Sequence, residues 1–202
     1  VTAFKLAQEL NPENPYYNNS LAYAYIKAEL YDDAIEYYQL AIKLNPDAEW
    51  TSIVCHALGA IYAEIKNNFE AAEATFNAGI VLDPNNVDIQ LSLGDLYMAQ
   101  NDLDRAIKTY CDAIAVEPEN YLTYAKTGLA LWEKDYLEES IVAFHKSIEL
   151  NPNFEIAQNN LGVVYLDGIG DPKESVQYFK NAIDINPNYT LAYFNLGRAY
   201  QS

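Results

Sequence analysis

Apolar residues recur along this chain every three or four positions, which is the spacing of helices with one buried face. In residues 31–46, for example, Ala34, Tyr38 and Ala41 fall on a single helical face. A proline stands five residues after Ala41, as it does after several similar sets. Proline ends a helix because it has no N–H and its ring clashes with the preceding turn. The pattern therefore predicts a series of amphipathic helices that stop at prolines.

The prolines define a repeat of about 34 residues, which is the first feature to establish in any such chain. They are Pro12, Pro46, Pro84, Pro118, Pro152 and Pro187, with spacings of 34, 38, 34, 34 and 35 residues. Five residues before each proline is a small residue: Ala7, Ala41, Gly79, Ala113, Ser147 and Ala182. Three residues earlier is an aromatic: Phe4, Tyr38, Phe76, Tyr110, Phe144 and Phe179. Small residues beside bulky ones on one face allow two helices to pack closely.

A second motif, Leu-Gly-x-x-Tyr or a near variant, precedes each of these helices. It occurs at Leu58-Gly59-Tyr62, Leu93-Gly94-Tyr97, Leu161-Gly162-Tyr165 and Leu196-Gly197-Tyr200, with weaker forms at Leu21-Ala22-Tyr25 and Thr127-Gly128-Leu131. Glycine inside a helix costs about 1 kcal/mol relative to alanine. Its recurrence at one register therefore indicates close contact with a partner helix.

This combination of motifs resembles the tetratricopeptide repeat (TPR) family along essentially the whole chain. The resemblance implies an all-α fold, a right-handed superhelical solenoid of antiparallel two-helix repeats. We expect about twelve helices, no strand, and a single array of repeats. The expected divisions are 1–11 (second helix of a partial repeat), 15–48, 49–86, 87–120, 121–154, 155–189 and 190–202 (first helix of a sixth repeat). The incomplete repeats at both ends suggest that the parent protein continues in both directions.

Three departures from the regular period are visible. The first helix of the second repeat has three extra residues around Trp50, and the turn before Ala72 has one extra. The turn at residues 167–171 also has one extra residue, and its Gly168-Ile169-Gly170 is similar to the turn of the related Sel1-like repeats.

The composition narrows the classes of function. The chain carries 29 acidic residues against 12 Lys and Arg, a formal net charge of -17. Such a surface repels phosphate backbones and anionic lipid, so we expect no nucleic-acid partner. No apolar run approaches the roughly 18 residues of a membrane span, so we expect no membrane insertion.

Candidate chemistry is sparse. Cys55 and Cys111 belong to no metal-type cluster, and His56 and His145 lack the spacing that places two ligands on one helix face. No nucleophile motif or phosphate-binding loop is present. We therefore expect no catalytic residue, no metal site and no cofactor, and hence not an enzyme.

The family resemblance implies that the first helix of each repeat lines a concave face that binds a peptide or helix. The residues expected to contact a partner there are Leu91, Asp95, Met98, Leu122, Lys126, Leu129, Trp132, Ile156, Asn160 and Val163. Trp132 is the expected central anchor. With the acidic residues Asp88, Asp95, Glu133 and Asp167 nearby, the surface favours an apolar segment flanked by Lys or Arg.

The family has two known peptide-binding motifs, and we compared the residues of this chain with each of them. The carboxylate clamp of chaperone adaptors is absent, because Asn19, Tyr23, Ala57, Asp88 and Ser92 occupy its positions. The asparagine ladder that holds peptide backbone is partial, with only Asn160 and Asn195 in place. The leading interpretation is a protein-binding scaffold. The alternatives are a structural segment that self-associates through its open ends, and a non-catalytic regulatory region of a larger enzyme.

Overall fold

The computed structural model describes residues 1–44 and 47–202, so Pro46 lies outside the described residues. The described residues form twelve α-helices and two short π-helical segments, and none of them forms a strand, which confirms the predicted all-α class. The elements are α1 (Thr2–Leu10), α2 (Pro15–Lys27), α3 (Tyr31–Leu44), α4 (Ala48–Ala60), η1 (Ile61–Ile65), α5 (Phe69–Leu82), α6 (Val87–Ala99), α7 (Leu103–Val116), α8 (Tyr121–Glu133), α9 (Leu137–Leu150), α10 (Glu155–Val163), η2 (Val164–Ile169), α11 (Pro172–Ile185) and α12 (Thr190–Gln201).

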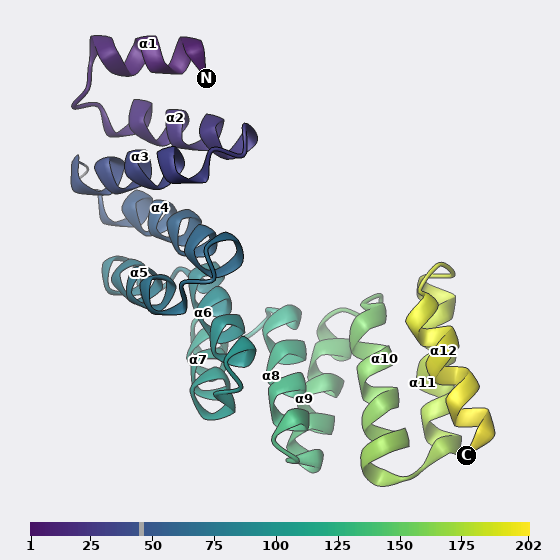
Figure 1. The fold of residues 1–202 in the computed structure, drawn as a ribbon. Coiled ribbons are helices and arrows are strands. Elements are labelled where there is room, and N and C mark those ends of the chain that lie inside the picture. The colour runs from purple at the N-terminus through teal and green to yellow at the C-terminus, as the bar shows by residue number, and fades with distance from the viewer. Residues whose placement is uncertain (45–46) are drawn as a thin grey trace. The chain divides into compact units, whose positions relative to one another are not determined.

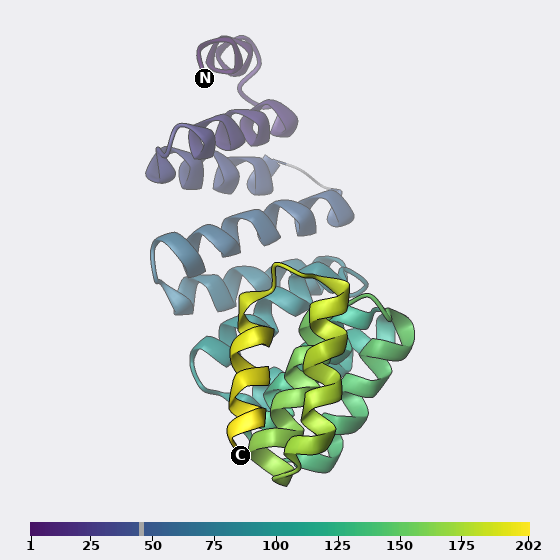
Figure 2. The same ribbon diagram turned by 90° about the vertical axis from the view of Figure 1, so that its right-hand side faces the viewer.

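The chain divides into two compact units, unit 1 (Val1–Leu96) and unit 2 (Tyr97–Ser202). In unit 1, α2 pairs with α3 and α4 pairs with α5 as antiparallel helices (Figure 1). In unit 2, α8 pairs with α9 and α10 with α11, while α12 packs against α11 (Figure 2). We call the even-numbered helices the A helices and the odd-numbered ones the B helices, after their order within a repeat. The repeat boundaries expected from the sequence stay a prediction.

Polar side chains cap the start of α2, α4, α5, α7, α8 and α11. The side chains of Asn14, Asp47, Asn68, Asp102, Asn120 and Asp171 each accept hydrogen bonds from backbone N–H groups of the following turn. Such caps satisfy donors that have no partner within the helix. Pro15 and Pro172 occupy the first helical turn, where a missing N–H costs nothing.

The five complete B helices, α3, α5, α7, α9 and α11, each span 14 residues. Four of them end at Asp83, Glu117, Asn151 and Asn186, whose backbone is close to extended and which each precede a proline. The ring of a following proline disfavours helical backbone at the residue before it. The repeated prolines therefore determine where these helices end.

The recurring glycines lie against the recurring aromatics. A β-carbon on Gly59 would be 2.4 Å from the ring of Phe76, and one on Gly162 would be 2.6 Å from that of Phe179. Phe76 and Phe179 are almost completely buried. The Leu-Gly motif thus lets the B-helix ring approach the A-helix backbone, as its register predicts.

The turn from each A helix to its B helix is closed by one backbone hydrogen bond to the motif tyrosine position. The N–H groups of Leu30, Asp102 and Tyr136 donate to the carbonyls five residues earlier, those of Tyr25, Tyr97 and Leu131, at 2.9 Å. The residue just before each donor is left-handed: Glu29, Asn101 and Asp135 have positive φ. Asn and Asp tolerate this conformation better than other non-glycine residues.

The two repeats with one extra residue keep the same anchor but take a wider turn. Asn68 donates to Tyr62 and Asp171 to Tyr165, in both cases six residues back, at 2.8 Å. The extra residue is absorbed in the π-helical segments η1 and η2 that precede these turns. We expected it within the loops, whereas the structure places it in the end of the helix, because a π turn accommodates one added residue without breaking the helix.

The extra residues around Trp50 lengthen a helix rather than a loop. The α4 helix begins at Ala48, capped by Asp47, and continues through η1 to Ile65. The helical segment formed by α4 and η1 is therefore longer than α6, the A helix of the next repeat, which has 13 residues. The insertion therefore adds about one turn at the start of α4.

Each unit has a core of its own. In unit 1 it contains Leu21, Tyr25, Tyr38, Val54 and Leu58. Unit 2 contains one cluster around Phe144, Leu161 and Val164 and another around Leu166 and Phe179. No helix in the described part of the chain is both long and apolar enough to cross a membrane.

Candidate functional site

The ten residues expected to contact a partner fall on both units. Leu91 and Asp95 belong to unit 1, and the other eight belong to unit 2. Leu91 is only 6% exposed, so it offers little surface to a partner, whereas Asp95 is exposed. Met98 is half-buried at the start of unit 2.

In unit 2 the remaining residues form a surface on α8 and α10, which we call the A-face. Leu122 and Leu129 are each 37% exposed and Ile156 is 41% exposed. The half-buried members are Lys126, Trp132, Asn160 and Val163. The two helices are joined at both ends. At one end the rings of Tyr121 and Phe154 meet edge to face, with their centroids 5.0 Å apart.

Trp132 holds the other end of the A-face together. A β-carbon on Gly168 of η2 would be 2.6 Å from the Trp132 ring, so the ring packs directly on the glycine backbone. Trp132 also packs against the core cluster around Phe144. Its side chain therefore has a structural role in addition to the binding role expected from the sequence.

A chain of polar side chains crosses from α10 to α12. The Asn195 amide donates to Asn159 Oδ1 at 2.9 Å, and the Asn159 amide donates to Asn160 Oδ1 at 3.2 Å. Arg198 donates to Asn195 at 3.4 Å and to Asp167 at 2.7 Å. Asn159 and Asn195 are buried, so their hydrogen bonds are made in a setting where an unpaired amide would be costly.

Asn160 is among the site residues expected from the sequence, whereas Asn159 is not. Asn159 was identifiable in principle, because Asn159 and Asn195 are separated by 36 residues, one repeat plus one or two positions. The same register in unit 1 holds His56 and Ser92, whose side chains lie 2.7 Å apart. Polar pairs at this position thus join successive A helices in both units.

His56 differs from the asparagines because it titrates. Burial lowers the pKa of the His56 imidazole below its ordinary value, and the nearby charges of Asp88 and Glu64 oppose this only in part. The neutral ring is therefore the favoured form, with one nitrogen bonded to Ser92.

The acidic flanks of the A-face are partly neutralised. Asp167, one of the acidic residues expected there, forms an ion pair with Arg198 at 2.7 Å. Asp167 consequently contributes less attraction for a basic partner than the sequence analysis assumed.

The two cysteine thiols have raised pKa values. Burial raises the pKa of the Cys55 thiol and of the Cys111 thiol, which reduces their thiolate fraction at neutral pH. Within the described residues, no three His, Cys, Asp or Glu side chains come close enough to hold a metal ion.

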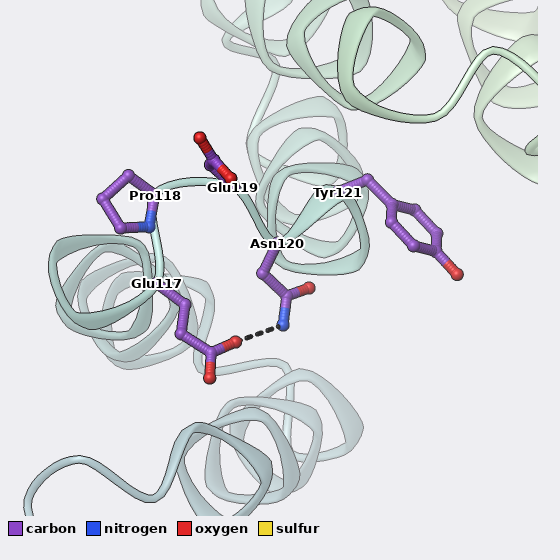
Figure 3. A pocket seen from close by; sticks show the side chains of 5 residues that line it. All are labelled: Glu117, Pro118, Glu119, Asn120 and Tyr121. Atoms are coloured by element: carbon purple, nitrogen blue, oxygen red, sulfur yellow. Dashed lines mark hydrogen bonds between the residues drawn. The ribbon is translucent and has the colours of Figure 1, made fainter.

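One depression lies at the turn between α7 and α8 (Figure 3). Five consecutive residues from Glu117 to Tyr121 line it, and the Asn120 amide donates to Glu117 at 3.0 Å. Figure 3 shows the Tyr121 ring pointing away from Glu117. Because Asn120 also caps α8, we interpret this depression as part of the turn between two repeats.

Comparisons with known proteins agree with this architecture. Family models described as tetratricopeptide repeat match residues 15–48, 60–121, 123–154 and 157–189. The peroxisomal targeting signal receptor of Candida albicans is 29% identical over 194 residues, covering 86% of this chain and 30% of that protein. The BBSome complex member BBS4 of Bos taurus is 36% identical over 97 residues, covering 48% of this chain and 18% of that protein. This chain thus spans less than a third of either relative.

A solved structure supports the fold directly. YrrB, described as a TPR protein with an unusual peptide-binding site, superposes with a TM-score of 0.71 at 22% identity, covering 95% of this chain and 96% of that one. The helix pairs, the Gly–Phe contacts and the matching family models together show that the chain belongs to the tetratricopeptide repeat family.

Proposed function

We propose that this chain is a non-catalytic scaffold that binds a segment of a partner protein on the A-face of unit 2. The observation that carries the proposal is a set of apolar side chains at equivalent positions of successive A helices. Leu122 on α8 and Ile156 on α10 are equivalent, and both are exposed to more than a third. Burying such side chains against a partner is the main source of affinity in protein interfaces.

Asn160 adds a polar element to this surface. Its side-chain oxygen accepts a hydrogen bond from the Asn159 amide at 3.2 Å. An amide that both donates and accepts suits the backbone of an extended segment. Two similar proteins are consistent with this proposal, since one is a peroxisomal targeting signal receptor and YrrB is described as having an unusual peptide-binding site.

The partner proposed is an apolar segment flanked by Lys or Arg. The net charge of -17 favours basic flanks and opposes acidic ones. Such long-range attraction mainly raises the association rate and weakens as salt is added. We propose no nucleic-acid or membrane partner.

The test is a selection of random 15-residue peptides on the immobilised chain, followed by titration of the peptides that bind. Leu122→Ser combined with Leu129→Ser should weaken binding by about tenfold or more, because two apolar anchors are lost. Val81→Ser is the control, since Val81 is 81% exposed on a B helix of unit 1. Equal binding to wild type and to the double variant would refute the A-face proposal.

Trp132→Ala should weaken binding by about 2 kcal/mol or more if Trp132 is the centre of the site. Because the Trp132 ring also packs on Gly168, the same variant should lose stability. Binding is therefore measured only under conditions where circular dichroism shows the variant folded. Unchanged affinity in the folded variant would exclude Trp132 as an anchor.

A further inference from the structure

A second apolar groove lies in unit 2, away from the A-face, between the B helices α7 and α9. It is a cavity of about 610 Å³ lined by Ile114 of α7, Tyr124 and Thr127 of α8, and residues of α9 that include Val142. Thr127 is buried, whereas Val142 is 68% exposed. The groove therefore has a buried base in α8 and an open apolar edge on α9.

The repeat pattern indicates that this groove is more than a packing gap. At the position of Val142, the other complete B helices carry Glu36, Ala74, Lys108 and Gln177. At the position of Tyr124, the other complete repeats carry Asn18, Cys55, Gln90 and Gln158. A large apolar side chain at both positions is specific to this repeat, and fold requirements common to all repeats do not explain it.

The equivalent groove in unit 1 provides an internal comparison. It is a cavity of about 410 Å³, and it is lined by Cys55, Ala71 and Ala74 where unit 2 has Tyr124, Glu139 and Val142. A smaller groove therefore exists at the equivalent place, with alanine where unit 2 has Val142 and without an acidic residue in its lining. This makes unit 1 a natural negative control for binding.

The charges around the unit 2 groove indicate which occupant it fits. Glu138 and Glu139 line it in the first turn of α9 and are exposed. At its other end Lys146 already pairs with Glu149 at 2.9 Å. The rim is therefore net negative, which favours a partner with Lys or Arg beside its apolar face and disfavours a second copy of this chain, whose net charge is -17.

The length of the groove indicates the form of that partner. On α9 the lining residues run from Glu138 to Lys146, about 12 Å along the helix axis. Apolar residues at positions i, i+3, i+4 and i+7 of a bound helix cover about 10.5 Å. A helix of two to three turns with one apolar stripe thus matches the groove.

We propose that the groove between α7 and α9 is a docking site for a basic amphipathic helix of another protein. This site is separate from the A-face and does not depend on the function proposed for it. The chain would then hold two partner segments, one on A helices and one between B helices.

The probe is a synthetic 16-residue helix with Leu at the stripe positions, Lys on the flanks and Ala elsewhere, titrated by fluorescence anisotropy. Val142→Asp should weaken its binding by about tenfold or more. This variant adds negative charge, so purely electrostatic attraction of the Lys-rich probe predicts tighter binding instead. Val142 is exposed enough that the variant should keep its helical content, which circular dichroism checks.

Matched variants complete the experiment. Ala74→Asp, the equivalent change in unit 1, should change affinity less than about twofold. Glu138→Gln with Glu139→Gln should weaken binding at low salt and not at high salt, whereas Glu9→Gln with Glu13→Gln in unit 1 should have a smaller effect. A probe with Glu in place of Lys, and one with its Leu residues scrambled, should bind at least about tenfold more weakly.

Three results would overturn the docking site. In the first, the probe binds Val142→Asp as tightly as wild type or more tightly. In the second, Leu122→Ser/Leu129→Ser loses probe binding while Val142→Asp keeps it. In the third, the chain self-associates and Val142→Asp abolishes that self-association. The second result would move the probe to the A-face and leave the function proposed above standing. The third would make a second copy the occupant.

Discussion

Single glycines determine how closely the two helices of a repeat approach. In unit 1 the Phe76 ring lies 2.4 Å from where a β-carbon of Gly59 would be, and in unit 2 the Phe179 ring lies 2.6 Å from that of Gly162. The helix-propensity cost of glycine is thus offset by the burial of a whole aromatic side chain. Gly197 has the same place in the motif, but nothing lies within 4 Å of its missing β-carbon.

Gly59→Ala and Gly197→Ala should therefore have opposite effects. The first forces the Phe76 ring to move in a packed core and should lower the free energy of unfolding by about 1–3 kcal/mol. The second should be neutral or raise it by up to about 1 kcal/mol, because alanine favours a helix. Urea denaturation of both variants measures the difference. Equal effects would mean that the glycines do not act through contact with the aromatic ring.

His56 should make stability depend on pH. Because burial lowers the pKa of His56 in the folded state, the unfolded chain binds a proton more readily. The stabilisation is fully present above the ordinary histidine pKa of about 6.5 and is lost as the pH falls toward the folded value. The free energy of unfolding should thus fall more steeply between roughly pH 7 and pH 5 for wild type than for His56→Gln.

His145 supplies the control for this experiment. It is exposed, and His145→Gln controls for the loss of an imidazole as such. Because all three proteins have the same carboxylates, the difference between the curves reports His56 together with its coupling to Asp88 and Glu64. Parallel curves for wild type and His56→Gln would contradict a stabilising role for the half-buried neutral ring.

At the scale of the helix, the turn between paired helices behaves as a fixed unit. In five repeats a backbone N–H closes the turn on the carbonyl of the motif tyrosine position, whether five or six residues back. The π-helical segments η1 and η2 take up the difference. The extra residue changes the width of one helical turn and leaves the following B helix with its usual 14 residues.

Deletion of Glu64 should therefore be tolerated. It is an exposed residue of η1, and its removal restores the five-residue spacing between Tyr62 and Asn68 that regular repeats use. Deletion of Ala57 within α4 instead rotates the residues on one side of the gap by about 100°, which takes Leu58 and Gly59 out of register. Thermal unfolding should show a small shift for the first deletion and a large loss for the second. Comparable losses would indicate that the π turn itself is required.

At the scale of the whole molecule, the two units have separate cores and unequal helices. The α1 helix contains no buried residue, whereas α9 buries Ser140, Ala143, Phe144 and Ser147. In repeat proteins stability is close to a sum of local terms between neighbours, so weakly packed helices open independently. Local opening is then expected to vary along the chain.

Amide hydrogen exchange should follow this order. We expect the fastest exchange in α1 and the slowest in the third and fourth repeats, particularly in α9 around Phe144. Removing residues 1–11 should cost about 1 kcal/mol or less, because little apolar surface is uncovered. Uniform protection from α1 to α12 would instead show that the chain unfolds as one cooperative block.

The sequence by itself determined the helices, their order and the contacts within each repeat. Proline positions predicted where B helices end, and the Gly and aromatic registers predicted which side chains meet, because both depend on local backbone sterics and a fixed helical period. The family and its scaffold class followed from the same regularities. The single-array division and the binding residues are still predictions.

Only the tertiary structure decided the exposure, the contacts and the charge pairing of individual side chains, which the repeat pattern does not specify. That Leu91 is buried, that Trp132 rests on Gly168 and that Asp167 is paired with Arg198 all depend on residues from another helix. The groove beside Val142 was also missed, because a single apolar residue on an outer helical face is common and acquires meaning only next to Ile114 and Tyr124. Periodicity specifies which face of a helix is buried, but the exposure and charge of each remaining side chain depend on what the neighbouring repeat places against it.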